Sequence, residues 1–147
     1  NEVANFNIMT YLSLIMALIT IESQGNDFAK GDRGKALGCL QLHEAYVYDA
    51  AEHAGNYWVH EDAYQRDVAV KILMAYMDRY ATVERLGRHP TMEDIARIHN
   101  GGPNGYKKES TKAYWAKVKK ELDSYDILWK SKSKQTSQHT QLKPNIH

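Results

Sequence analysis

Glu22 is the first residue of this sequence whose position suggests chemistry. It ends the stretch 12–22, in which the other ten residues are apolar or carry a small hydroxyl group. A carboxyl group partly removed from water keeps its proton to higher pH, because its charged form loses solvation. Such a group can act as a general acid toward a glycosidic oxygen. A helix-terminal glutamate that points into solvent is the equally weighted alternative at this stage.

A second carboxylate would decide the reaction, because glycoside hydrolysis normally uses one protonated and one ionised carboxyl group. Asp32 follows Glu22 in the chain and lies in a polar Gly-Asp-Arg-Gly turn that would keep it ionised. It could then serve as a nucleophile or as an electrostatic stabiliser. Asp27 competes for this role, and both aspartates also suit purely structural positions in turns.

Other reactive side chains do not form a recognisable site in the sequence. Cys39 and His43 are close in the chain, but no third orienting group is evident, so a buried and inert thiol is expected. The seven histidines lack metal-ligand spacing, which predicts no metal site. The segment 100–105 follows a predicted helix and lacks the Gly-Lys-Ser/Thr ending of a phosphate loop. No cofactor is expected.

Helices separated by glycine-bearing turns must position these side chains. Apolar spacing and turn residues predict a mainly α fold, a single compact domain around a buried central helix. The expected elements are a nearly all-apolar helix over 7–23, a turn or short hairpin over 30–42, helices over 43–53 and 61–81, a short helix opened by a Thr91–Asp94 capping box, a break over 100–105 and a last helix from Thr111.

Charge divides the chain into a body and a tail. The 147 residues carry a net charge of +1, but residues 130–147 contain four lysines and no acid, so the body is slightly acidic. An acidic body argues against a nucleic-acid partner. The predicted domain is therefore 1–129, and 130–147 is expected to be a disordered, polar and basic tail.

The apolar run 11–21 is too short to span a membrane, and no basic residue precedes it as in a signal peptide. No membrane partner is therefore expected. Any targeting segment would lie upstream of Asn1. The single cysteine also means that the fold cannot depend on an internal disulfide.

Two blocks of the sequence resemble the invertebrate-type, destabilase-like lysozymes, which also have bacterial and phage relatives. The first runs from Ile21-Glu22-Ser23 through Gly31-Asp32-Arg33-Gly34 to Tyr46. The second is similar to the family's ARIHNGGP-G signature at 96–105, and continues with Thr111, Tyr114-Trp115 and Val118. Together the blocks extend over roughly two-thirds of the chain. The invertebrate members are rich in disulfides, so this chain is more similar to the cysteine-poor bacterial and phage relatives.

The resemblance implies an α+β lysozyme-like fold and a muramidase, which hydrolyses the β-1,4 bond between N-acetylmuramic acid and N-acetylglucosamine in peptidoglycan. It implies that Glu22 is the general acid/base and Asp32 the nucleophile or stabiliser of a retaining reaction. The residues expected to contact the glycan are Gln41, Tyr46, His99, Asn100 and Gly101. Gly101 could alternatively allow close packing of a neighbouring segment.

Two other functions remain open from the sequence. The Glu-Ser and Gly-x-x-Gln pattern is shared with lytic transglycosylases, which use one glutamate and no second carboxylate. An inactive glycan-binding or virion-structural module would keep the fold without catalysis. A peptidoglycan-cleaving enzyme is expected to be secreted, periplasmic or delivered by a phage.

Overall fold

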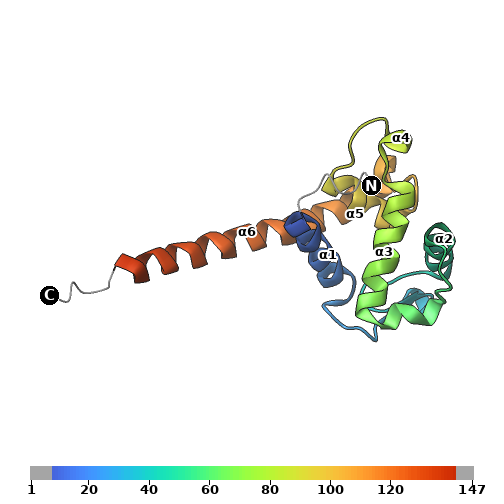
Figure 1. The fold of residues 1–147 in the computed structure, drawn as a ribbon, viewed down its shortest axis with the longest axis horizontal. Helices are drawn as coiled ribbons and strands as arrows, with labels where there is room; N and C mark the ends of the chain where they lie inside the picture. The colour runs from blue at the N-terminus through green and yellow to red at the C-terminus, as the bar shows by residue number, and fades with distance from the viewer. Residues whose placement is uncertain (1–7, 142–147) are drawn as a thin grey trace.

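The computed structural model describes residues 8–141, without the side chains of 127, 129 and 135–141. Figure 1 shows a helical domain from which one long helix projects. Its elements are α1 (Ile8–Ser23), β1 (Lys30–Gly31), β2 (Ala36–Leu37), α2 (Glu44–Ala54), α3 (Arg66–Tyr80), α4 (Val83–Leu86), α5 (Met92–Gly101) and α6 (Lys112–Gln141), with short 3-10 turns between several of them. The predicted mainly α class with one small hairpin is confirmed.

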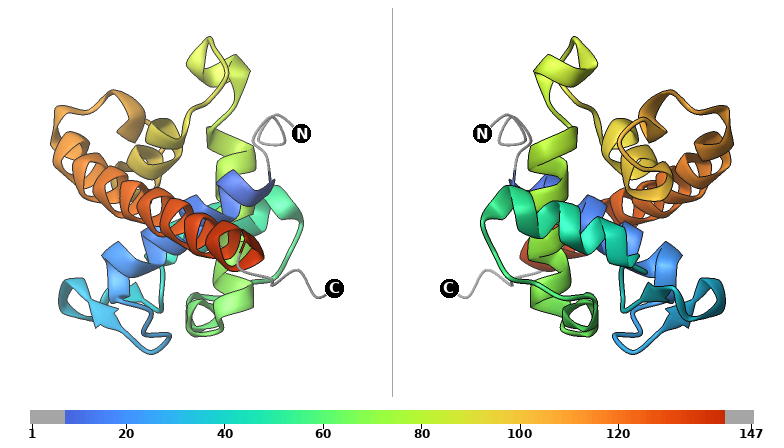
Figure 2. Two further views of the ribbon diagram at one scale, coloured as in Figure 1. Left: turned by 90° about the vertical axis from the view of Figure 1, so that its left-hand side faces the viewer. Right: turned by 90° about the vertical axis from the view of Figure 1, so that its right-hand side faces the viewer.

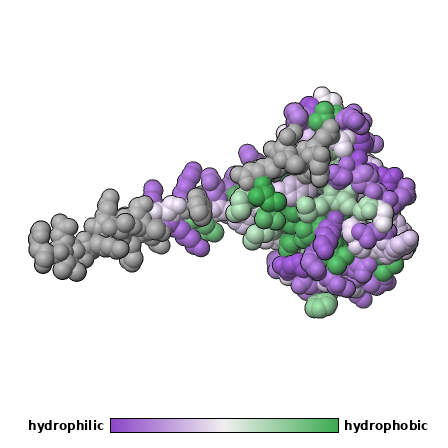
Figure 3. Space-filling model, viewed as in Figure 1, coloured by the Kyte–Doolittle hydropathy of each residue, from purple (hydrophilic) through white to green (hydrophobic). Residues whose placement is uncertain are grey.

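Helix α1 is central but is not buried on all sides. It packs against α5 and α6 and contributes Leu14, Ala17 and Leu18 to the main hydrophobic core. Its other face leaves large apolar side chains exposed, which corrects the expectation from its nearly all-apolar sequence: Ile8, Met9, Leu12 and Met16. Figure 3, drawn in the same view as Figure 1, shows hydrophobic residues at the surface where α1 lies. An apolar pattern sets what a helix can bury, whereas its neighbours set what is covered.

The predicted hairpin forms beside the C-terminal end of α1. Strands β1 and β2 are antiparallel and pair Lys30 with Leu37 and Gly31 with Ala36. Both views of Figure 2 place this hairpin at the end of the molecule opposite α4. The tight turn between the strands contains Asp32, so the fold presents this carboxylate at a hairpin tip.

The single helix predicted over 61–81 is wrong, because the structure breaks it at Gln65. A 3-10 turn at His60–Tyr64 precedes α3, and Gln65 between them has extended backbone angles. The break allows Arg66 to reach back to the turn after α1, where its Nε donates to Asp27 Oδ1 at 2.8 Å. This contact joins segments 39 residues apart, so local apolar periodicity could not reveal it.

Helix α5 begins with the predicted capping box. The Asp94 backbone N–H donates to Thr91 Oγ1 at 3.2 Å, and the Thr91 backbone N–H donates to Asp94 Oδ2 at 2.8 Å. These bonds satisfy donors that every helix N-terminus leaves open. The helix ends at Gly101, two residues into the predicted break, and places His99 in its last turn.

Helix α6 is longer than predicted. Its first part packs against α1 and α5, and Figure 1 shows the remainder extending away from the domain. The helix continues to Gln141, so residues 130–141 are helical where disorder was predicted. A packed helical segment can propagate into a polar sequence, because each added residue gains a backbone hydrogen bond without a new nucleation cost. Residues 142–147 of the predicted tail lie outside the described part.

Across residues 8–141, no helix is both long and apolar enough to cross a membrane.

Candidate active site

Glu22 lies in the last turn of α1, largely enclosed by other helices. Its side chain is 19% exposed, and Oε2 lies 3.2 Å from Nε2 of His99 on α5. The sequence left open whether this carboxyl group is enclosed or solvent-facing, and the structure places it in the partly buried state. A partly desolvated carboxyl group with one hydrogen-bonding neighbour is suited to holding and releasing a proton.

His99 is buried behind Glu22 instead of lying at the surface. Its side chain is 2% exposed. Nε2 lies 3.0 Å from the backbone oxygen of Leu40, and Nδ1 lies 3.0 Å from the hydroxyl of Tyr46. Both ring nitrogens therefore have partners within the protein, which leaves no free nitrogen for the predicted contact with a sugar. The structure directs His99 toward the glutamate.

Ser23 fixes the end of α1 to the neighbouring loop. Its hydroxyl lies 2.8 Å from the backbone oxygen of Cys39, next to the Leu40 carbonyl that faces His99. The sequence showed Ser23 beside Glu22 but gave no reason to assign it this role. Cys39 itself is buried, and burial raises the pKa of its thiol to about 11, which suits the inert thiol expected from the sequence.

Asp32 has a different environment from Glu22. It is 59% exposed at the tip of the hairpin, and its Oδ2 lies 3.3 Å from Nε2 of His43. Asp32 and Arg33 have φ of 48° and 57°, a left-handed conformation that is costly for residues other than glycine and occurs often at functional sites. Its competitor Asp27 is held by Arg66, which gives Asp27 a structural role.

The Gln41 side chain supports this hairpin by hydrogen bonds to the backbone on both sides of it. Its Nε2 donates to the backbone oxygens of Ala29 at 3.2 Å and Gly38 at 2.9 Å. A Cβ atom at Gly31 would lie 2.1 Å from Gln41 Oε1, so a side chain at position 31 would displace the Gln41 amide. These contacts make Gln41 a support of the loop that carries Asp32.

The remaining predicted glycan contacts divide into buried and exposed positions. Tyr46 stacks on Tyr76 with ring centroids 3.7 Å apart, and its hydroxyl faces His99. Asn100 is exposed beside the buried His99 and is accessible to a ligand. A Cβ atom at Gly101 would lie 2.5 Å from Cγ2 of Thr111, so this glycine serves close packing, the second of its two possible roles.

A buried hydrogen-bond network around Arg97, next to the loop after α5, was not assigned from the sequence. The Arg97 guanidinium donates through Nε to Thr111 Oγ1 at 2.8 Å and through a terminal nitrogen to the Lys108 backbone oxygen at 2.7 Å. A Cβ atom at Gly105 would lie 2.0 Å from the Arg97 backbone oxygen. Arginine, threonine and glycine at these positions therefore hold the loop after α5. Their presence in the family-like block was the only available signal.

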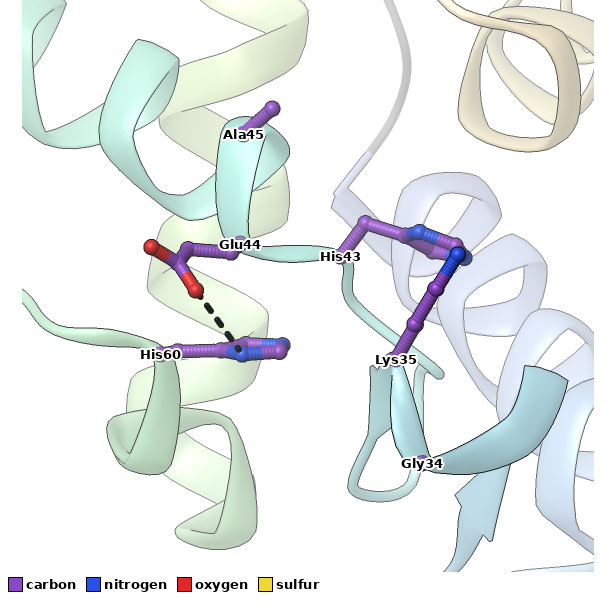
Figure 4. Close-up of a pocket in the computed structure, with 6 residues that line it drawn as sticks. All are labelled: Gly34, Lys35, His43, Glu44, Ala45 and His60. Atoms are coloured by element: carbon purple, nitrogen blue, oxygen red, sulfur yellow. Dashed lines mark ion pairs between the residues drawn. The ribbon is translucent and has the colours of Figure 1, made fainter.

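A shallow cavity of about 380 Å³ lies beside the Asp32 partner His43. Figure 4 shows Lys35 extending toward His43, while Glu44 faces His60 across a separation of 4.0 Å between Oε2 and Nδ1. The cavity opens at the start of α2, next to the hairpin. Its lining includes the ionisable side chains of Lys35, His43, Glu44 and His60, which the sequence had not indicated as one cluster.

Among the described residues, no group of three or more His, Cys, Asp or Glu side chains is arranged to hold a metal ion.

Comparisons with known proteins agree with this architecture. A family model described as Destabilase matches residues 14–121. A lysozyme of Ostrea edulis is 34% identical over 88 residues, 58% of this chain and 61% of that protein. A lysozyme of Meretrix lusoria is 38% identical over 92 residues, 62% of this chain and 72% of that protein. The chain thus spans less than two-thirds of the length of the Ostrea relative.

Solved structures show the same fold. Meretrix lusoria lysozyme in complex with Aeromonas hydrophila PliI has a TM-score of 0.63 and 32% identity, over 74% of this chain and 87% of that one. Tapes japonica lysozyme has a TM-score of 0.60 and 27% identity, over 72% and 85%. The predicted lysozyme-like α+β fold and the predicted family are both confirmed. With a family match that runs from within α1 into the first part of α6, the chain belongs to the Destabilase family.

Proposed function

We propose that this protein is a muramidase, a glycoside hydrolase that cleaves the β-1,4 bond between N-acetylmuramic acid and N-acetylglucosamine in peptidoglycan. The fold and family shared with the bivalve lysozymes support this activity. Peptidoglycan strands are then the partner. Such an enzyme meets its substrate outside the cytoplasm, so we propose a secreted, periplasmic or phage-delivered protein.

The contrast between two carboxyl groups carries the proposal. Glu22 is 19% exposed and Asp32 is 59% exposed. Enclosure favours the protonated form of a carboxyl group, whereas contact with water favours the ionised form. Two carboxyl groups whose environments differ in this way supply the acid and the anion that glycoside hydrolysis requires.

The reaction we propose is retaining and has two steps. Glu22 gives its proton to the glycosidic oxygen while the bond to C1 breaks, and the Asp32 carboxylate attacks C1 to form a glycosyl intermediate. The ionised Glu22 then takes a proton from water, and the resulting hydroxide equivalent displaces Asp32 from C1. Each carboxyl group returns to its starting state. Asn100 is the exposed residue beside this site that we propose contacts the glycan.

The substitution Glu22→Gln tests this proposal, because it removes the acid and keeps the shape of the side chain. We expect normal folding and a loss of cell-wall lysis of at least about 100-fold, the typical contribution of a general acid. Asp27→Asn is a matched control that weakens the ion pair with Arg66 while leaving the proposed chemistry intact. Wild-type lysis by Glu22→Gln would reject the assignment.

The products distinguish hydrolysis from the transglycosylase alternative. Mass spectrometry of digested peptidoglycan should show reducing ends, whereas a lytic transglycosylase would leave anhydro ends that are lighter by one water. Asp32→Asn should abolish lysis by a retaining hydrolase and leave a transglycosylase active. Anhydro products together with an active Asp32→Asn variant would reject the two-carboxylate mechanism.

A further inference from the structure

Three helices contribute side chains to one hydrogen-bonded chain that ends at Glu22. The Tyr46 hydroxyl on α2 lies 3.0 Å from Nδ1 of His99 on α5, and Nε2 of the same ring lies 3.2 Å from Oε2 of Glu22 on α1. Nε2 also lies 3.0 Å from the Leu40 backbone oxygen. The proposed proton donor is thus connected to a buried tyrosine through a histidine.

The Leu40 carbonyl fixes one proton of this chain. A carbonyl oxygen can only accept a hydrogen bond, so Nε2 of His99 must carry hydrogen. That N–H is shared between Leu40 O and Glu22 Oε2. Glu22 therefore accepts at Oε2, and Oε1 is the oxygen that carries the proton when the carboxyl group is neutral. The other nitrogen, Nδ1, either accepts from Tyr46 or carries a second hydrogen.

Tyr46 favours the first of these two states. Burial is the main reason why the pKa of Tyr46 lies well above its ordinary value, so its hydroxyl keeps its hydrogen. Among the described residues, Nδ1 of His99 is the hydrogen-bond acceptor that this hydroxyl faces. If Nδ1 carried hydrogen, the Tyr46 O–H would lose that acceptor inside the protein. An unsatisfied buried donor costs free energy.

The two states contain the same number of protons and differ in where one proton lies. In the first, Glu22 is neutral and carries it on Oε1, and His99 is neutral. In the second, the proton has left Oε1 and Nδ1 carries one instead, which gives a carboxylate beside an imidazolium. Only the first state can protonate a glycosidic oxygen. On the proposed muramidase function, the distribution between these states decides how much enzyme is active.

We propose that Tyr46 acts through His99 to keep this proton on Oε1 of Glu22. Tyr46 and His99 are then positioning residues of the proton donor, which gives a role to two side chains that were expected to bind sugar. The stacking of Tyr46 on Tyr76 at 3.7 Å holds the hydroxyl in place.

The titratable groups around this chain support the assignment. Four titratable groups among the described residues act electrostatically on Tyr46. One is the Glu22 carboxyl group, and the others are tyrosines from α1, α3 and α6: Tyr11, Tyr76 and Tyr114. The positive charge that a second hydrogen gives His99 would therefore be balanced by the negative charge of an ionised Glu22. The proton balance between these two residues is controlled by the hydrogen bond at Nδ1.

The substitution Tyr46→Phe tests this role, because it removes the hydroxyl and keeps the stacked ring. Without the Tyr46 O–H, Nδ1 of the neutral ring loses its hydrogen-bond donor, and the ring is held against Glu22 through Nε2 alone. The proposed role then predicts that a smaller share of the enzyme is in the first state. Because the two states contain the same number of protons, lysis should fall by roughly fivefold on the plateau of the pH profile, and the alkaline limb should not move to lower pH.

Nitrogen NMR of His99 gives a readout that does not depend on activity. Wild-type protein at neutral pH should show a neutral ring with hydrogen on Nε2, and Tyr46→Phe should show a larger fraction with hydrogen on both nitrogens. Tyr80→Phe is the matched control. The Tyr80 ring belongs to the same aromatic cluster, 4.8 Å from that of Tyr76, and its hydroxyl bonds to Asp49 at 3.1 Å without a link to Glu22. Its lysis profile and its His99 signals should match the wild type.

Two results would overturn this inference. One is a wild-type His99 that carries hydrogen on both nitrogens at neutral pH, and the other is a Tyr46→Phe profile that superimposes on the wild-type profile. The substitution Glu22→Gln separates this failure from failure of the muramidase proposal. An inactive Glu22→Gln with an unchanged Tyr46→Phe would reject only the positioning role, whereas an active Glu22→Gln would reject the function itself.

Discussion

Glu22 and Asp32 have the same functional group but differ in what surrounds them. Glu22 lies in the last turn of a core helix against a buried histidine, and Asp32 lies at an exposed hairpin tip beside His43. These different surroundings are the basis on which we predict different chemical roles for the two side chains.

Tyr114 is a buried residue near Glu22 whose hydroxyl group lowers the stability of the folded state. Its hydroxyl is buried without a hydrogen-bond partner among the described residues, and Glu22 acts on it electrostatically. Burial is the main reason why its pKa lies far above the ordinary value. A buried hydroxyl that makes no hydrogen bond destabilises the folded state.

We therefore expect Tyr114→Phe to increase the free energy of unfolding by about 1 kcal/mol, because it removes a polar group that has lost its hydration. Urea unfolding measures this change. Tyr80→Phe is the control, since the Tyr80 hydroxyl donates to Asp49 Oδ2 at 3.1 Å and the loss of this bond should destabilise the protein. A Tyr114→Phe variant that unfolds at lower urea than the wild type would contradict this account.

At the scale of elements, α5 is the helix that links the site to the rest of the core. Its last turn carries His99, and its first turn is held by the Asp94 capping box. The buried Asp94 carboxylate also bonds to both terminal nitrogens of Arg88. Burial raises the pKa of Asp94, but the bonds from Arg88 and Thr91 outweigh it and hold the pKa below its ordinary value.

This shift predicts how stability depends on pH. A carboxyl group whose folded pKa is lowered stabilises the protein above its unfolded pKa and loses that effect as the pH falls through the folded value. Asp94→Asn should therefore reduce the free energy of unfolding at pH 7 by roughly 1–3 kcal/mol. It should also weaken the loss of stability between about pH 5 and pH 2. Chemical unfolding at several pH values measures both effects.

Asp62→Asn is the control for the capping interaction alone. The Asp62 carboxylate accepts the Val59 backbone N–H at 2.9 Å at the start of a short 3-10 turn. Its substitution should have a smaller effect at pH 7. Equal effects of the two substitutions, with the acid dependence unchanged in Asp94→Asn, would show that the charge on Asp94 is unimportant.

At the scale of the whole molecule, the domain and the outer part of α6 differ in their contacts. The core residues come from α1, the hairpin loop, α2, α3, α5 and the first part of α6, ending at Val118. Further along, the described side chains of 130–134 are exposed. Tolerance to truncation depends on the burial of the removed residues, so the outer helix is expected to add little to domain stability.

Removal of residues 130–147 should therefore change the melting temperature by less than about 2 °C. It should also reduce the helical circular dichroism signal, because residues 130–141 are helical. Thermal unfolding of the full and shortened chains measures both effects. A decrease of many degrees would show that the domain extends beyond the boundary predicted at residue 129.

Local patterns determined much of this architecture. Capping residues, apolar spacing and glycine-rich turns act over a few neighbouring residues, so the sequence predicted α1, the hairpin and the start of α5 close to their observed bounds. The two family-like blocks likewise identified the family and indicated Glu22 and Asp32, whose catalytic roles stay predictions.

Only the tertiary structure decided which groups meet. His99 faces Glu22 from 77 residues away, and Tyr46 faces His99 from 53 residues away. Arg66, directly after the break at Gln65, likewise contacts Asp27 across 39 residues. Each of these contacts depends on how whole helices pack, because packing fixes the direction in which a side chain points. A periodic sequence predicts that a helix has a buried face, whereas the neighbour on that face is set by the fold.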